Sequence, residues 1–214
     1  MPKRKLKPAA MLNPVPAVMV SCGQGAEKNI ITVAWTGIVN SNPPMAYISV
    51  RKSRFSHELI RKSGEFVINL TTETLSRAVD FCGVKSGRDV DKWKETGLTA
   101  KRAEKVRCPL IEESPVNLEC RVSEIREYPS HDMFIAEILQ VHVDESLFDE
   151  KGRIALDEAG LLCYSHGEYF GVKKKPVGRF GFSVMKAKTR KRINREPRST
   201  TSAGLKCGAI PSLT

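Results

Sequence analysis

Short stretches of apolar and polar residues in alternation dominate this chain. The clearest, over 116–123, alternates four times, which is typical of a strand with one face on a core and the other in water. Residues 45–51 predict a second short strand. Further β-rich stretches are 17–22, 30–39, 66–70 and 133–143. The last of these is apolar on both faces, so we expect it to lie centrally in its sheet.

Helices are predicted to be few and short. Residues 55–63 carry a small apolar stripe between a candidate N-cap, Ser53, and a stop at Gly64. Two more helices are expected, over about 72–81 and 89–96. Because strands do not alternate with long helices, the pattern disfavours a parallel βαβ sheet. We expect a mainly β fold of the β-rich α+β class, an antiparallel barrel with a few short helices outside it.

The composition is typical of an ordinary soluble protein, and most of the net positive charge lies near the two ends of the chain. It has 214 residues, of which 41% are hydrophobic and 28% charged, and a net charge of +11. Residues 1–10 contribute +4 and residues 185–214 contribute +7, so the body over 11–184 is nearly neutral. We therefore expect a basic N-terminal tail, one folded domain and a basic, disordered C-terminal tail. Such tails can also bind polyanions weakly, although a nucleic-acid partner is disfavoured.

The sequence offers little support for a membrane or secreted protein. No apolar run approaches the roughly 20 residues that span a bilayer. Prolines at 8, 14 and 16 interrupt the stretch that a secretory signal would use. The six cysteines lie far apart with no CxxC pair, which favours free thiols. We expect a cytoplasmic protein without contact with a membrane.

Several common kinds of active site are disfavoured by their missing motifs. The four histidines are scattered, and neither HExxH nor GxSxG occurs, so we expect no metal site and no serine nucleophile. We expect His142 to be a satisfied histidine of the core or its rim. Gly23 and Gly25 lack the third glycine of a dinucleotide fingerprint, so any nicotinamide would bind in another way.

The strongest chemical signal lies where a predicted strand passes into the helix at 55–63. Three serines and three cations fall within eight residues, namely Ser49, Arg51, Lys52, Ser53, Arg54 and Ser56. Hydroxyls, guanidinium groups and the free N–H groups of a helix N-terminus together suit a phosphate. A capped helix with solvated arginines remains an equally good interpretation of this segment taken alone.

Two other segments add to the phosphate hypothesis. Residues 29–37 combine small side chains with backbone amides that a flat ring can approach closely. Residues 81–93 contain two glycines, which permit tight turns, together with the donors Ser86, Arg88 and Lys92. The three segments together predict a site for a phosphorylated aromatic cofactor, with flavin mononucleotide (FMN) as the first candidate.

Six motifs occur in the order seen in one protein family. They are 29–37, 42–44, 49–57, 66–70, 86–92 and 166–170. With them the chain, over about 11–180, resembles the flavin reductase-like family of FMN-binding split-barrel proteins, which includes flavoredoxins and flavin or ferric reductases. The resemblance implies a Greek-key, antiparallel split β-barrel that forms homodimers, with one FMN per subunit near the dimer interface.

The resemblance also implies which residues would hold the cofactor. The flavin ring would lie against Thr32, Val33, Ala34, Trp35 and Thr36, and the phosphate against the serine and arginine cluster of residues 49–56. Secondary contacts would be Asn69, Cys82, Gly83, Ser86 and Lys92. His166 would lie on the side where a nicotinamide or acceptor approaches, although a purely structural role suits it as well.

The function implied is electron transfer through bound FMN. The first hypothesis is an oxidoreductase that takes electrons from NAD(P)H and gives them to a small acceptor such as free flavin or a ferric complex. The second is a flavoredoxin-like carrier that a redox partner protein reduces. A third, weaker hypothesis is a polyanion binder that acts through its basic tails.

Overall fold

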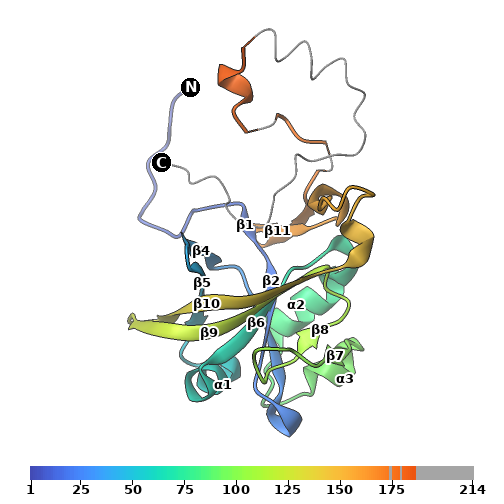
Figure 1. Cartoon of the computed structure of the whole chain (residues 1–214). Helices are drawn as coiled ribbons and strands as arrows, with labels where there is room; N and C mark the ends of the chain where they lie inside the picture. The colour runs from blue at the N-terminus through green and yellow to red at the C-terminus, as the bar shows by residue number, and fades with distance from the viewer. Residues whose placement is uncertain (174, 179, 187–214) are drawn as a thin grey trace.

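The fold centres on a seven-stranded antiparallel sheet that curls into a half-barrel (Figure 1). A computed structural model describes residues 1–173, 175–178 and 180–186. The strand order is β3-β2-β6-β9-β10-β5-β4, with β2 at Val18–Cys22, β3 at Asn29–Val33, β4 at Thr36–Ser41, β5 at Pro44–Arg51, β6 at Glu65–Asn69, β9 at Val116–Glu127 and β10 at His131–Val143. The expected mainly β, antiparallel architecture is confirmed, and β10 lies between two neighbours, as predicted.

The two edge strands of this sheet, β3 and β4, follow each other in the chain. Ala34 and Trp35 link them, and the amide of Ser49 on β5 donates to the Trp35 carbonyl at 2.9 Å. The β-rich stretch predicted at 30–39 forms two strands, because the chain leaves its partner β2 and pairs next with β5. This change of partner brings the two edges of the half-barrel together.

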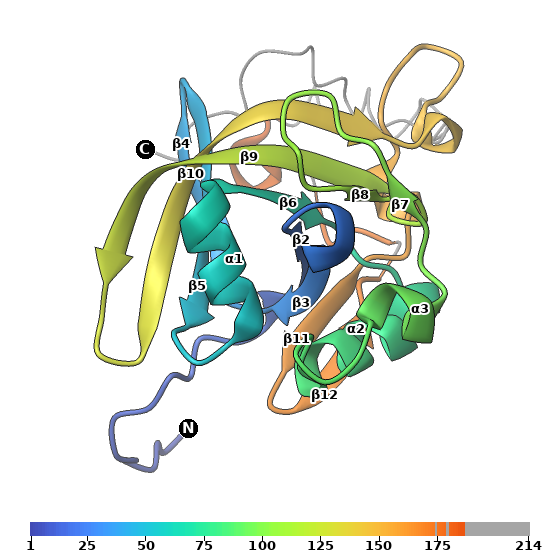
Figure 2. The ribbon, with the colours of Figure 1, turned by 90° about the horizontal axis from the view of Figure 1, so that it is seen from below.

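Three short α-helices of the described chain pack against the sheet. Helix α1, Phe55–Ser63, lies across the open end of the curled sheet, in contact with β2, β3 and β6 (Figure 2). It ends at Gly64, as predicted, where φ is +68°. Its N-cap is Arg54 rather than the expected Ser53, because Arg54, after the turn at residues 52–53, still has an extended backbone conformation.

The other two predicted helices are shorter or divided. The segment expected at 72–81 forms a 3-10 turn, η2 at Glu73–Leu75, followed by α2 at Ser76–Val84. Helix α3 covers only Lys92–Thr96, because Asp91 acts as its N-cap and accepts hydrogen bonds from the amides of Trp93 and Lys94. Both helices contact β3.

Smaller elements complete the described chain. A three-stranded sheet contains β1 at Val15–Pro16, β11 at Leu162–Ser165 and β12 at Glu168–Gly171. Strands β7 at Ala100–Lys101 and β8 at Leu110–Ile111 form a separate pair. Short 3-10 turns are η1 at Gly25–Glu27, η3 at Glu145–Leu147, η4 at Leu156–Glu158 and η5 at Phe182–Val184.

Apolar side chains pack on both faces of the curled sheet. One cluster fills its inside, with Phe66, Ile48 and Phe134 fully buried. A second cluster lies outside, between β2 and β3 and the helices α2 and α3, around Met19 and Trp93. Since β2 is buried along its whole length, its side chains contribute to both clusters.

Strand β9 departs from its predicted pattern on the face expected to be in water. Asn117 and Glu119 are buried, because the segment 103–110 covers this face. The Glu119 carboxylate accepts hydrogen bonds from the amides of Glu104, Lys105 and Val106, and its Oε1 lies 2.5 Å from His142 Nε2. His142 is thus a partly buried histidine with a partner, as expected.

The two ends of the chain can be described only in part. Residues 1–10 are exposed and have no regular secondary structure. Most of the predicted disordered tail, residues 187–214, lies outside the described residues. Within the described ranges, no helix is long and apolar enough to cross a membrane. The five cysteines described there are free thiols, as expected.

Candidate functional site

Two adjoining cavities open where the edges of the sheet meet. The first has a volume of about 460 Å³ and the second of about 410 Å³, both within the usual range for ligand sites. Ile31, Arg51 and Arg54 line both of them. The two arginines therefore stand where one cavity passes into the other.

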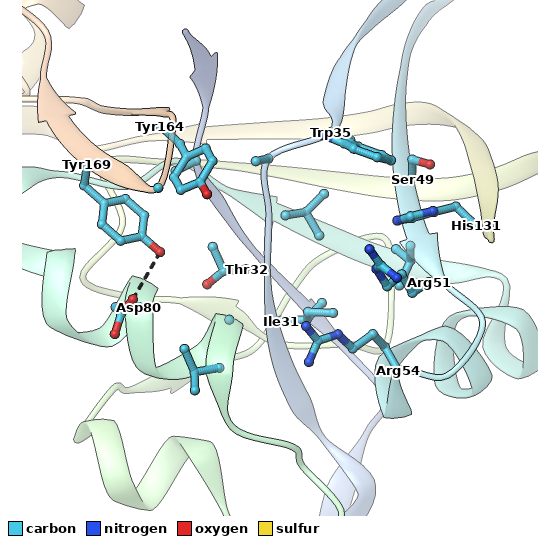
Figure 3. Close-up of a pocket in the computed structure, with 17 residues that line it drawn as sticks. Ile31, Thr32, Trp35, Ser49, Arg51, Arg54, Asp80, His131, Tyr164 and Tyr169 are labelled. Atoms are coloured by element: carbon cyan, nitrogen blue, oxygen red, sulfur yellow. Dashed lines mark hydrogen bonds between the residues drawn. The ribbon is translucent and has the colours of Figure 1, made fainter. Parts of the chain in front are cut away.

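The first cavity lies against the link between β3 and β4 (Figure 3). Thr32, Val33, Ala34 and Trp35 form one side of it, with Ser49 from β5. Asp80 and the tyrosines Tyr164 and Tyr169 stand on the opposite side (Figure 3). A Cβ added at Gly83 would lie 3.3 Å from the Thr32 Cβ, so the glycine lets α2 approach β3 closely.

The second cavity collects the hydroxyls and cations of the turn before α1. Ser53, Arg54 and Ser56 line it together with Asn29 and Ser86. The Asn29 amide donates to Ser56 Oγ at 2.8 Å, which orients that hydroxyl. The first N–H groups of α1 have no intrahelical acceptor and carry the positive end of the helix dipole. This cavity has the chemistry of an anion site.

Lys92 adds a buried positive charge to the second cavity. Its side chain is buried, and its ammonium donates to the carbonyls of Ile30 and Cys82 at 2.8 Å each. Desolvation lowers the pKa of Lys92. Since an ammonium has three N–H donors, one is left for an anion in the cavity that Lys92 lines.

Several residues named as candidates do not line either cavity. The Thr36 hydroxyl donates to the Tyr47 carbonyl, and Lys52 lies 3.2 Å from Asp132. Asn69 is fully buried, and its amide forms hydrogen bonds with β2, β6 and β8. Burial raises the pKa of the Cys82 thiol to about 11, and only the carbonyl of that residue approaches the site, through Lys92.

His166 lies at the tip of the hairpin between β11 and β12. It is exposed, with φ at +52°, in the turn that it shares with Gly167. Neighbouring residues of the hairpin, Tyr164, Gly167 and Tyr169, line the first cavity, whereas His166 does not. The structure therefore brings the hairpin to the site without bringing the imidazole into it.

Sequence reasoning missed His131, Asp80 and the two tyrosines of the site. His131 faces Arg51 across the β10–β5 pair and lines the first cavity. Desolvation, and then the charge of Arg51, lower the pKa of His131, so its ring is neutral near pH 7. No local motif marks His131, Asp80 or Tyr164, and Tyr169 lies within the motif at 166–170 without having been singled out. Strand pairing and helix packing bring these residues together from distant parts of the chain.

The chain is similar to known proteins in sequence and in fold. The model of a family described as flavin reductase like domain matches residues 11–173. An uncharacterized protein of Pyrococcus abyssi is 31% identical over 139 residues, which cover 65% of this chain and 80% of the relative.

Two solved structures show the same fold. The flavoredoxin of Desulfovibrio vulgaris (Miyazaki F) has a TM-score of 0.78 and 28% identity, covering 85% of this chain and 99% of that one. The flavoredoxin of Methanosarcina acetivorans has a TM-score of 0.74 and 27% identity, covering 86% and 100%.

Proposed function

The chain belongs to the flavin reductase-like domain family, and from this premise we propose that it is an FMN-binding oxidoreductase. It takes electrons from NADH or NADPH and passes them through FMN to a small acceptor, such as free flavin or a ferric complex. One observation carries the proposal. A cavity bounded by a backbone link and aromatic side chains continues, past Arg51 and Arg54, into an anion site at a helix N-terminus.

The residues present fit each part of FMN. Guanidinium groups, serine hydroxyls and the buried ammonium of Lys92 suit a phosphate dianion. In the first cavity the aromatic side chains of Trp35 and Tyr164 can contact a planar ring system, and Gly83, which has no side chain, lines the cavity beside them. FMN, when bound, supplies hydride and single-electron transfer, and the protein binds, orients and tunes it.

The chain's own residues have separable tasks in this proposal. Arg51 and Arg54 hold the phosphate and set the position of the ring along the cavity. The link at Ala34 and Trp35 presents backbone to one edge of the ring. His131, neutral at pH 7, adds no charge beside Trp35, so the positive charge lining the two cavities comes from Arg51, Arg54, Lys85 and Lys92.

A second function is supported by the similarity to two flavoredoxins. In this alternative the chain is an electron carrier, and a redox partner protein rather than a nicotinamide dinucleotide reduces its FMN. The site is the same in both cases. The difference lies in whether NADH or NADPH can reach the ring.

We also propose a homodimer with the site near its interface. Trp35, Ile38 and Val39 are 46%, 59% and 50% exposed, on the link and the edge strand beside the first cavity. Apolar side chains grouped at a sheet edge suit contact with a second copy. A cytoplasmic location is proposed on the free thiols, which suit a reducing compartment.

The decisive experiment is an absorbance spectrum of the purified protein followed by anaerobic addition of NADH or NADPH. A flavin spectrum, with FMN released on denaturation, is the expected result. Bleaching without any added protein supports the reductase, and bleaching only with a reductase partner supports the carrier. A protein that neither retains FMN nor binds added FMN would overturn both.

A matched pair of variants tests the anion site. Arg54→Gln is expected to weaken FMN binding at least tenfold and to leave the affinity for riboflavin, which lacks the phosphate, within about twofold. Arg126→Gln is the control, because Arg126 is an exposed arginine of β9 paired with Glu124. Equal losses for FMN and riboflavin in Arg54→Gln would place the phosphate elsewhere.

A further inference from the structure

A buried carboxylate lies behind the anion site without lining it. Asp132 on β10 is fully buried, beside Val50 of β5. Its Oδ2 lies 2.8 Å from His57 Nε2 and accepts a hydrogen bond from Arg61 at 3.2 Å. The ammonium of Lys52 lies 3.2 Å from Oδ1. One carboxylate thus has three basic partners.

These partners lie on both sides of the turn that forms the anion site. Lys52 comes just before the turn at residues 53–56, and His57 comes directly after it. Arg61 lies one helical turn beyond His57. Because Asp132 belongs to β10, which pairs with both β9 and β5, its contacts tie both ends of the turn to the sheet. The opposite side of the turn is held by Asn29, which donates to Ser56.

Electrostatics keep Asp132 ionised in this position. Burial alone would raise the pKa of its carboxyl, but hydrogen bonds with His57 and Lys52 hold the pKa below its ordinary value. A buried ion pair often adds little net stability compared with a well-packed apolar core. We therefore expect the ion pairs of Asp132 to fix the geometry of the turn more than they stabilise the fold.

We propose that Asp132 is a positioning residue that makes this site prefer phosphorylated flavin to riboflavin. This inference rests on the proposed function. Fixing both ends of the turn keeps Arg54, Ser53 and Ser56 in place before the phosphate arrives, so binding does not have to order them. The flavin ring lies in the first cavity, to which the turn contributes only Arg54, so ring binding depends little on Asp132.

An opposing electrostatic effect has to be separated from this one. Asp132→Asn removes a negative charge near the anion site and by that alone favours phosphate binding. Glu127→Gln is the matched control, because Glu127 faces Asp132 across the β9–β10 pair and lies 2.8 Å from Arg61. Its side chain is 54% exposed, and among the described contacts it pairs with neither Lys52 nor His57.

The experiment measures dissociation constants for FMN and riboflavin with the full-length wild type, D132N and E127Q at pH 7.5. D132N is expected to weaken FMN binding about tenfold, or about 1.4 kcal/mol, while riboflavin binding stays within about twofold. E127Q is expected to leave both constants within about twofold. The inference is overturned if D132N leaves the affinity for FMN relative to riboflavin unchanged, or if E127Q lowers this relative affinity as much as D132N does.

A second variant guards against loss of folding. If D132N does not fold, His57→Leu removes one donor to Asp132 and leaves Lys52 and Arg61 in place. The affinity for FMN relative to riboflavin is then expected to fall less than tenfold but more than it falls in E127Q. If this relative affinity does not fall, the inference is overturned. Failure of the proposed function looks different, because the wild type itself would then bind neither flavin or show no preference for FMN.

Discussion

The centroid of the His131 imidazole ring lies 4.6 Å from that of the Trp35 indole ring, and the planes of the two rings meet at an angle of 35°. The two residues come from the start of β10 and from the link between β3 and β4, and they form one wall of the first cavity. Trp35 is 46% exposed, whereas the other tryptophan, Trp93, is 4% exposed in the outer core. Only one of the two indoles can therefore meet a ligand directly.

Titration with FMN is accordingly expected to quench the emission of Trp35 and to affect Trp93 less, because Trp93, a residue of α3, is buried in the cluster between the helices and the strands β2 and β3. Trp35→Phe keeps an aromatic wall, so FMN should still bind within about fivefold of the wild type while most of the quenching disappears. Fluorescence titration of both proteins checks this. Quenching of undiminished size in Trp35→Phe would place the ring away from the link.

The sequence predicted the grouping of hydroxyls and cations before α1 because those residues are contiguous, whereas the role of this group in binding an anion stays a prediction. Ser53, Arg54 and Ser56 lie in one turn, and the change from strand to helix is visible in local periodicity and in Gly64. His131 and Tyr164 were missed for the opposite reason. Their place in the site depends on the pairing of β10 with β5 and of β11 with β1, and such long-range register has no local signal.

The polar face of β9 shows another limit of pattern reading. Alternation predicts which residues share a face, but not what covers that face. Glu119 was expected in water, yet three backbone amides and His142 surround its carboxylate. A buried carboxylate of this kind is recognisable only when the segment that supplies its donors is placed.

Glu119→Gln is expected to destabilise the protein by about 2–4 kcal/mol. The amide cannot accept from all three backbone donors, and buried donors left without a charged acceptor are costly. Glu113→Gln is the control, because Glu113 also accepts from a backbone amide, that of Thr99, but is exposed. It should cost less than about 1 kcal/mol. Urea unfolding of the three proteins gives the comparison, and equal costs would contradict it.

The same carboxylate gives a pH dependence with a defined sign. Burial opposes ionisation of Glu119, but the backbone donors and His142 lower its pKa in the folded state. Its contribution is therefore complete above the unfolded pKa of about 4.3 and is lost as the pH falls through the folded value. The stability difference between wild type and Glu119→Gln should stay constant from pH 7 to 5 and shrink below pH 4. A difference that persists undiminished at pH 2 would exclude this explanation.

Gly87 lines the second cavity and lies next to Asn29. A Cβ at this position would lie 2.3 Å from Asn29 Oδ1. Asn29 is 3% exposed and orients Ser56 through its amide, so it cannot move aside without disturbing the anion site. Gly87→Ala is therefore expected to weaken FMN binding about tenfold while the affinity for riboflavin stays within about threefold.

A double-mutant cycle separates this clash from a general effect of alanine on the backbone. Asn29→Ala removes both the obstacle to a Cβ and the donor to Ser56, so it should weaken FMN binding by itself, by about 1 kcal/mol for one hydrogen bond. If the clash is the cause, adding Gly87→Ala to Asn29→Ala changes the FMN dissociation constant by less than about twofold. Losses that multiply would show that the glycine acts through its own backbone and not through Asn29.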